Sequence, residues 1–196
     1  MSITRTAVPS AEPVTRVEAK LHLRIDHTDE DATIDDLIRV ARDLVEHDTG
    51  RALITQTWVL RLDAFPDTIE LPRPPLQSVT SVEYVDTAGD TQTLTADTDY
   101  TVDKYPCLGR IVPAYAQSWP TTRDVVNAVV VTYVAGYGDN ARDVPQPLQQ
   151  AMKLLIGEGF ENREAATVLP AAARMERLIG EMAYERLVAR YRVPRV

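Results

Sequence analysis

The sequence predicts an α+β fold, on three observations: helical periodicity near both ends, a run of strand patterns between them, and no repeated alternation of strand with helix. Helical patterns occupy 14–50 and 146–190, and about seven short strand patterns occupy 55–136. A run of strands between runs of helices favours an antiparallel sheet over a doubly wound parallel one.

A first short helix is predicted behind Thr15. Thr15 and Glu18 match the Ser/Thr-x-x-Glu capping box, and Val17 and Leu21 give the helix an apolar side. The acidic run 26–31 follows, and we expect its carboxylates to cap the next helix and to oppose the positive end of its dipole.

The second helix has the clearest pattern in the chain. Gly50 follows it as a stop signal. Its apolar residues recur at helical spacing, at Ile34, Leu37, Ile38, Ala41, Leu44 and Val45. Ion pairs four residues apart are predicted on its outer face, between Asp35 and Arg39, Arg39 and Asp43, and Arg42 and Glu46.

After Gly50 the apolar period changes from helical to alternating. Trp58, Leu60 and Leu62 alternate with more polar neighbours, which predicts a strand with one buried face. The β-branched run Asn127–Val134 predicts a central strand, buried on both faces.

Two later helices are predicted, over Gln146–Arg163 and Ala171–Tyr191. The first carries an apolar surface wider than the stripe of an ordinary surface helix, with Leu148, Ala151, Met152, Leu154, Leu155 and Ile156. We therefore expect one of its faces to contact something besides its own core. The apolar side of the last helix drifts around its axis, which suits a helix with two different neighbours.

The predicted domain organisation has three parts. These are a flexible N-terminal arm over 1–13, a single domain over 14–190 (helices 14–50, β-rich insertion 55–136, helices 146–190), and a C-terminal tail over 191–196.

The composition of the chain disfavours several classes of function. The formal net charge of -8 and the isoelectric point near 4.9 disfavour a protein that grips nucleic acid through its phosphates. No apolar run is long enough to cross a bilayer and the N-terminus lacks a signal peptide, so we expect a soluble protein made in a cytoplasm. Cys107 is the sole cysteine, which excludes an intrachain disulfide.

The sequence carries no pattern typical of catalysis. His22, His27 and His47 lack the spacing of a metal site, and the acidic run lacks the glycine and final glutamate of a calcium loop. Gly136-Tyr-Gly138 matches neither a dinucleotide-binding nor a phosphate-binding loop. We predict no enzyme activity, no metal and no cofactor.

Short motifs along nearly the whole chain match a known protein family in their order and spacing. They are Glu18-Ala-Lys-Leu-His-Leu-Arg-Ile25, Asp29-Glu-Asp31, Thr49-Gly-Arg-Ala-Leu53 with Thr57-Trp58, Leu71-Pro-Arg-Pro-Pro-Leu76 with Ser78-Val79, Val82-Glu-Tyr-Val-Asp86 with Gly89, Tyr100-Thr-Val-Asp103, Gly109-Arg-Ile111, Tyr133-Val-Ala-Gly-Tyr137 and Glu161-Asn-Arg-Glu164. With these residues the chain resembles the head-tail connectors of long-tailed bacteriophages and related gene transfer particles, which are head-completion adaptors. Gly157 and Gly159 depart from the family pattern, because they weaken a helix there.

The resemblance implies a fold and a set of partners. The fold would be a small helical bundle with a central antiparallel β-rich insertion, forming a dodecameric ring at the head-tail junction of a virion assembled in the bacterial cytoplasm. The partners would be the portal protein and a stopper or tail terminator, with DNA passing through the channel without specific binding, and with no membrane. The portal would be bound by Tyr191, Arg192, Val193, Pro194 and Arg195. We place the contacts between sister copies at Leu154, Ile156, Arg163 and Leu187.

Two other interpretations remain open from the sequence. One is a soluble enzyme or small-ligand binder with a pocket around Trp58, Tyr84, Tyr100 and Tyr133, although such aromatic residues are more often core. The other is a different ring protein of the same particle, such as a tail terminator.

Overall fold

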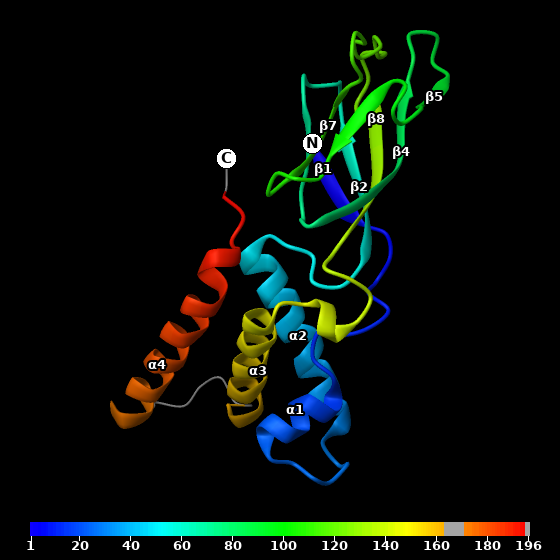
Figure 1. Cartoon of the computed structure of the whole chain (residues 1–196). Helices are drawn as coiled ribbons and strands as arrows, with labels where there is room; N and C mark the ends of the chain where they lie inside the picture. Colours follow the sequence, from blue (N-terminus) through cyan, green and yellow to red (C-terminus); the bar gives the residue numbers. More distant parts are fainter. Residues whose placement is uncertain (163–170, 195–196) are drawn as a thin grey trace. The chain divides into compact units, whose positions relative to one another are not determined.

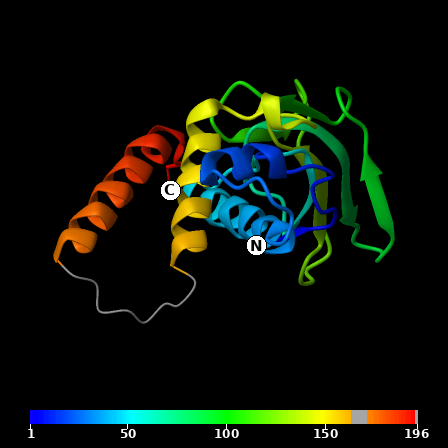
Figure 2. The same cartoon turned by 90° about the horizontal axis from the view of Figure 1, so that it is seen from below.

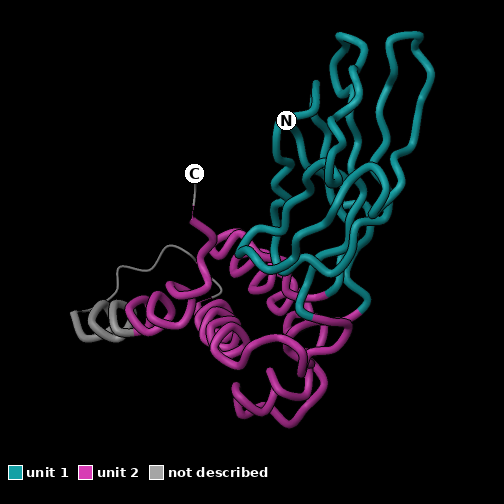
Figure 3. The backbone as a smooth tube through the Cα atoms, turned by 45° about the horizontal axis from the view of Figure 1, so that its top comes forward, with its two compact units in different colours: residues 1–10, 55–137 teal, residues 11–54, 138–196 magenta. Residues whose placement is uncertain are grey.

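The predicted α+β class is confirmed in a computed structural model, which describes residues 1–162 and 171–194, the side chains of 171–179 excepted. Its helices and antiparallel strands are labelled in Figure 1 and seen from below in Figure 2. Two compact units make up the chain (Figure 3). We call Met1–Ser10 with Thr55–Tyr137 the β unit, and Ala11–Ile54 with Gly138–Val196 the helical unit.

The β unit contains two antiparallel sheets. One sheet has five strands in the order β1-β2-β8-β4-β5, and the other has the order β3-β7-β6. The strands are β1 (Ser2–Arg5), β2 (Gln56–Leu62), β3 (Ile69–Leu71), β4 (Leu76–Val85), β5 (Thr91–Leu94), β6 (Tyr100–Asp103), β7 (Gly109–Pro113) and β8 (Val129–Ala135).

Strand β8 lies in the middle of the larger sheet, between β2 and β4, as the β-branched run predicts. Its burial alternates along the strand, however. Val129, Val131, Tyr133 and Ala135 are buried, whereas the residues between them are partly exposed. The prediction of two buried faces is therefore wrong, because an antiparallel sheet can leave one face partly in solvent even at its central strand.

The predicted flexible arm is wrong for residues 2–5. These residues form β1, which pairs antiparallel with β2 from Ser2 opposite Arg61 to Arg5 opposite Trp58. Thr6 extends the pairing, since its backbone N–H donates to the carbonyl of Thr57 at 2.9 Å. Apolar periodicity could not reveal this strand, because its pairing satisfies the backbone groups of the sheet edge and places no demand on side chains.

The helical unit is arranged around one helix. It contains α1 (Arg16–Leu23), α2 (Asp31–Thr49), the short η1 (Ala141–Asp143), α3 (Gln146–Glu161), α4 (Ala171–Val188) and η2 (Ala189–Tyr191). Helix α3 packs against α1, α2 and α4, and Figures 1 and 2 both show it between α4 and the other two. Leu148, Ala151, Met152 and Ile156 of its wide apolar surface are buried, whereas Leu154 and Leu155 stay partly exposed.

The capping box that begins α1 is confirmed. The Thr15 hydroxyl accepts a hydrogen bond from the Glu18 backbone N–H at 3.2 Å, and the Glu18 carboxylate accepts from the Thr15 backbone N–H at 2.9 Å. That backbone hydrogen bond lowers the pKa of Glu18 below its ordinary value of 4.5. The helix ends at Arg24, which has a left-handed φ of 58°.

The acidic run before α2 does not cap that helix as predicted. Glu30 occupies the N-cap without a side-chain capping hydrogen bond among the described residues. Asp31 instead accepts from Lys20 Nζ at 2.7 Å and from Arg16 Nη1 at 3.2 Å. Arg16 also donates to Asp35, with Nε at 2.7 Å from Oδ1. The carboxylates are therefore used to tie α1 to the start of α2, because basic side chains of α1 lie within their reach.

Side chains on the outer face of α2 bind residues outside the predicted set of pairs. Arg39 pairs with Asp36, and the buried Arg42 donates to Glu12 at 2.6 Å. The Glu46 carboxylate accepts from the backbone N–H of Leu53 at 2.8 Å. These contacts hold the segments before and after α2 on its surface.

The two glycines of α3 have different surroundings. A Cβ at Gly157 would be 3.7 Å from His22 Nε2, which is an ordinary contact. A Cβ at Gly159 would be 2.7 Å from Leu37 Cδ2, which is too close unless that side chain moves. Gly159 thus allows α3 to approach α2.

We expect Thr15→Ala to lower the free energy of unfolding by about 1 kcal/mol, because it removes an N-cap. The loss should shrink in acid, because the Thr15 hydroxyl also donates to the Glu18 carboxylate at 2.8 Å and protonation of that carboxylate weakens the bond. Since the folded-state pKa of Glu18 is lowered, its stabilising effect is present above pH 4.5 and is lost as pH falls through that lower value. Urea titrations followed by circular dichroism at neutral and acidic pH measure both effects. Thr15→Ser is the control and should retain most of the stability; equal losses in the two variants would contradict the role of the hydroxyl.

We expect Gly157→Ala to raise the free energy of unfolding by about 0.5–1 kcal/mol, because alanine favours the helix and the site has room. Gly159→Ala should give a smaller gain or a loss, because Leu37 must move to accept the methyl group. Thermal unfolding of the two variants side by side tests this. An equal gain from both would show that the close approach of α2 and α3 is not constrained at Gly159.

Candidate functional site

The aromatic residues of the proposed ligand pocket are mostly core. Trp58, Tyr100 and Tyr133 are buried, and the Tyr133 hydroxyl donates to the Pro72 carbonyl at 2.8 Å. Burial raises the pKa of Tyr133. Tyr84 meets Phe65 edge to face, with ring centroids 5.7 Å apart. These side chains pack within the β unit, so they do not support the interpretation of the chain as an enzyme or ligand-binding domain.

The described residues were compared with the side-chain clusters that bind metal ions. Among them no group of three or more His, Cys, Asp or Glu side chains could hold a metal ion. His22, His27 and His47 are exposed, and so is Cys107. No helix in the described part of the chain is long and apolar enough to span a membrane.

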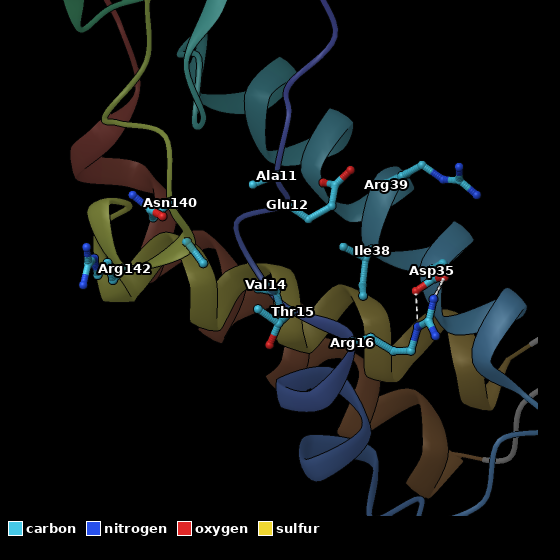
Figure 4. A pocket seen from close by; sticks show the side chains of 11 residues that line it. Ala11, Glu12, Val14, Thr15, Arg16, Asp35, Ile38, Arg39, Asn140 and Arg142 are labelled. Atoms are coloured by element: carbon cyan, nitrogen blue, oxygen red, sulfur yellow. Dashed lines mark hydrogen bonds and ion pairs between the residues drawn. The ribbon is translucent and has the colours of Figure 1, made fainter.

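The helical unit has a pocket of about 750 Å³ between the segment that precedes α1, the outer side of α2, and η1 (Figure 4). Its charged lining comprises Glu12, Arg16, Asp35, Arg39 and Arg142. Arg16 and Asp35 bind each other, as Figure 4 shows, and Glu12 binds Arg42.

Glu12 is the least satisfied group of this pocket. Its second carboxylate oxygen is buried and has no hydrogen-bond donor among the described residues. Burial raises the pKa of Glu12, although Arg42 opposes the rise. Arg16 pairs with Asp35, and Arg39 pairs with Asp36. The Thr15 hydroxyl is engaged in the capping box of α1, so the geometry of the pocket does not point to a reaction.

Of the predicted portal-binding residues, Tyr191 and Val193 are held by hydrogen bonds to their own chain, and Arg195 falls outside the described residues. The Tyr191 carbonyl accepts from Arg51 Nε at 2.6 Å, and the Val193 backbone N–H donates to the Thr49 carbonyl at 2.9 Å. We call this pair of hydrogen bonds the C-terminal latch. Only Arg192 and Pro194 of the described tail residues are exposed.

The latch closes on the C-terminal end of α2. Gly50 ends α2 with a left-handed φ of +72°, and a Cβ at this residue would be 3.4 Å from Val193 Cβ. Nearby, the Tyr184 hydroxyl donates to Asp48 at 2.6 Å. The end of α4 and the tail are thus held to α2, and portal binding by the tail stays a prediction.

The predicted ring-interface residues differ in accessibility. Ile156 is fully buried within the helical unit, so its side chain has no surface for a sister copy and does not fit this role. Leu154 and Leu187 are partly exposed. Arg163 lies outside the described residues.

Four exposed apolar side chains lie on the first two helices. On α1, Val17 is 77% exposed and Leu21 is 79% exposed; on α2, Val40 is 55% exposed and Leu44 is 46% exposed. The apolar side of α1 that Val17 and Leu21 predict is present, and it is exposed in the subunit. Sequence reasoning overlooked Val40, which lies outside the main apolar stripe of α2; its spacing of four from Leu44 was the available signal.

Comparison with known proteins gives a family and a set of related structures. A family model described as "Phage gp6-like head-tail connector protein" matches residues 17–88. The resemblance to head-tail connectors is thereby confirmed. A search of curated proteins found no match.

The whole chain shares its fold with chains of gene transfer agent (GTA) particles. A chain of "Neck of empty GTA particle computed with C6 symmetry" is 24% identical with a TM-score of 0.80. A chain of "Virion of native gene transfer agent (GTA) particle" is 26% identical with a TM-score of 0.78, and one of "Neck of native GTA particle computed with C12 symmetry" is 25% identical with a TM-score of 0.77. Each comparison covers 100% of this chain and 97% of the other.

We expect removal of residues 191–196 to lower the free energy of unfolding by about 1–2 kcal/mol, because both hydrogen bonds of the C-terminal latch are lost. Removal of 195–196 alone is the matched control, since it leaves Tyr191 and Val193 in place. Urea titrations of the two truncated proteins provide the measurement. Equal stability would mean that the latch adds nothing to the fold.

Proposed function

We propose that this chain is a structural head-tail connector, an adaptor without catalytic activity that forms a ring between the portal and the tail or stopper of a phage-like particle. One observation carries the proposal: the chain matches, over its full length, a 26% identical chain of a gene transfer agent virion, and a connector family matches its residues 17–88. The head-tail junction of a virion, assembled in a bacterial cytoplasm, is the corresponding location.

The symmetry of the related neck structures supports the proposal that the chain forms a ring. The related neck structures were computed with C6 and C12 symmetry, so chains of this fold recur around an axis in them. We infer a dodecamer here. Leu154 and Leu187, which are partly exposed, and Arg163 remain candidates for contacts with sister copies.

Two partners and one cargo belong to this function. The portal would be met by the tail, through Tyr191, Arg192, Val193, Pro194 and Arg195, and a stopper or tail terminator would bind the other side. Arg192 and Pro194 can reach a portal while the C-terminal latch stays closed, because both are exposed. The net charge of -8 supports a channel through which DNA passes without binding. Strong DNA retention by the purified ring at low salt would contradict that last point.

The test of the proposed function is the state of the purified chain, alone and with its portal. Native mass spectrometry and negative-stain microscopy should detect annular particles with about twelve copies, as a cyclic adaptor requires. Removal of residues 191–196 should weaken co-sedimentation of the chain with the portal, and removal of residues 195–196 alone should weaken it less. A chain that stays monomeric in both conditions and binds no portal would contradict the proposal.

A further inference from the structure

Four consecutive residues at the end of α2 contact the C-terminal segment of the chain. They are Asp48, Thr49, Gly50 and Arg51. The first accepts from the Tyr184 hydroxyl at 2.6 Å, and the third would place a Cβ 3.4 Å from Val193 Cβ. The other two form the C-terminal latch with Val193 and Tyr191. The end of α4 and the tail are therefore held along a continuous stretch of the chain.

The latch uses only backbone atoms of the tail. Its two hydrogen bonds engage the Tyr191 carbonyl and the Val193 N–H, and Arg192 between them has an extended backbone with φ -60° and ψ 130°. Successive side chains of an extended chain point to opposite sides. Tyr191 and Val193 are accordingly half-buried, whereas Arg192 and Pro194 are exposed. The latch thus fixes the path of the tail and leaves two of its side chains accessible.

The same hydrogen bonds satisfy polar groups at helix ends. The last four carbonyls of an α-helix have no partner within the helix, and the Thr49 carbonyl of α2 receives the Val193 N–H at 2.9 Å. The Tyr191 carbonyl, which ends η2, accepts from the guanidinium of Arg51 at 2.6 Å. A hydrogen bond from a charged donor is stronger than one between neutral groups. These contacts favour the closed latch in the isolated subunit.

The remaining contact of the exposed face is weak. Arg192 pairs with Glu185 at 2.8 Å, and the two side chains are 43% and 53% exposed. An exposed ion pair contributes little to stability, so a partner can replace it at small cost. A segment that is already ordered also loses less conformational entropy on binding than a free tail does.

The inference that follows rests on the proposed function, in which the tail meets the portal. We infer that the closed latch is the portal-binding form of the tail, and that Gly50 and Arg51 are positioning residues for this contact. They act through the tail, because they hold Arg192 and Pro194 at a fixed place on the helical unit. Opening of the latch lowers the affinity for the portal, because only the closed fraction of the chain is competent to bind.

The first test removes the side-chain donor of the latch. We expect Arg51→Met to bind the portal protein of the same particle about three- to tenfold more weakly than the wild type, because the closed fraction falls. Arg51→Lys keeps a charged donor and should lose less. Arg142→Met is the matched control, because it removes an exposed arginine of η1 that takes no part in the latch, and it should bind as the wild type does.

Affinities are measured by biolayer interferometry at a temperature at which circular dichroism shows every variant to be folded, so a loss of stability alone leaves them unchanged. Hydrogen exchange of the Val193 amide should be faster in Arg51→Met, because this amide donates to the Thr49 carbonyl in the closed latch. Arg51→Met with the affinity of the wild type would overturn the inference and leave the proposed function standing.

The second test locks the latch covalently. In a protein with Cys107→Ser, the substitutions Gly50→Cys and Val193→Cys bring two Cβ atoms to a separation of 3.4 Å, close to the average of about 3.8 Å in disulfides. The oxidised and reduced forms of this one protein are compared, so the strain of a cysteine at a left-handed φ is common to both. The oxidised form should bind the portal within about twofold of the wild type and no more weakly than the reduced form.

The locked protein separates the inference from its opposite. Loss of portal binding on oxidation, with recovery on reduction, would show that the tail must leave α2 in order to bind, and the inference would then be wrong while the proposed function stands. A wild-type chain that binds no portal contradicts the proposed function and the inference together.

Discussion

The helical unit depends on the burial of α3. Three helices use it as a common neighbour, and Leu148, Ala151, Met152 and Ile156 are buried in these contacts. Gly159 lets the helix approach Leu37 of α2. Because these buried residues of α3 are covered by their own chain, the subunit can form a packed core before it assembles, while Leu154 and Leu155 stay partly exposed.

The arrangement around α3 determines which surfaces remain for partners. Helix α1 is held on α2 by ion pairs from Arg16 and Lys20, so its inner side is occupied and its apolar outer side faces solvent. The tail is held on the other end of α2 by the C-terminal latch. Helix α2 thus holds both α1 and the segment that we assign to the portal.

The sequence predicted those features that depend on local patterns. The capping box of Thr15 and Glu18, the stop at Gly50 and the central position of β8 all follow from neighbouring residues and were found. The sequence also indicated that the chain has more apolar surface than its own core covers. It could not locate that surface, because periodicity shows that a helix face is apolar but not which element covers it. Ile156 was therefore assigned to an interface although it is buried. The hydrogen bond from Val193 to Thr49 joins residues far apart in the chain, so no local sequence pattern predicts it.

The most direct test of this account is a reconstruction of the ring in its particle. The account predicts a ring of this chain at the head-tail junction, in which Arg192 and Pro194 contact the portal while the C-terminal latch stays closed on α2. A map in which the chain forms no ring, or in which the tail contacts no portal, would contradict it.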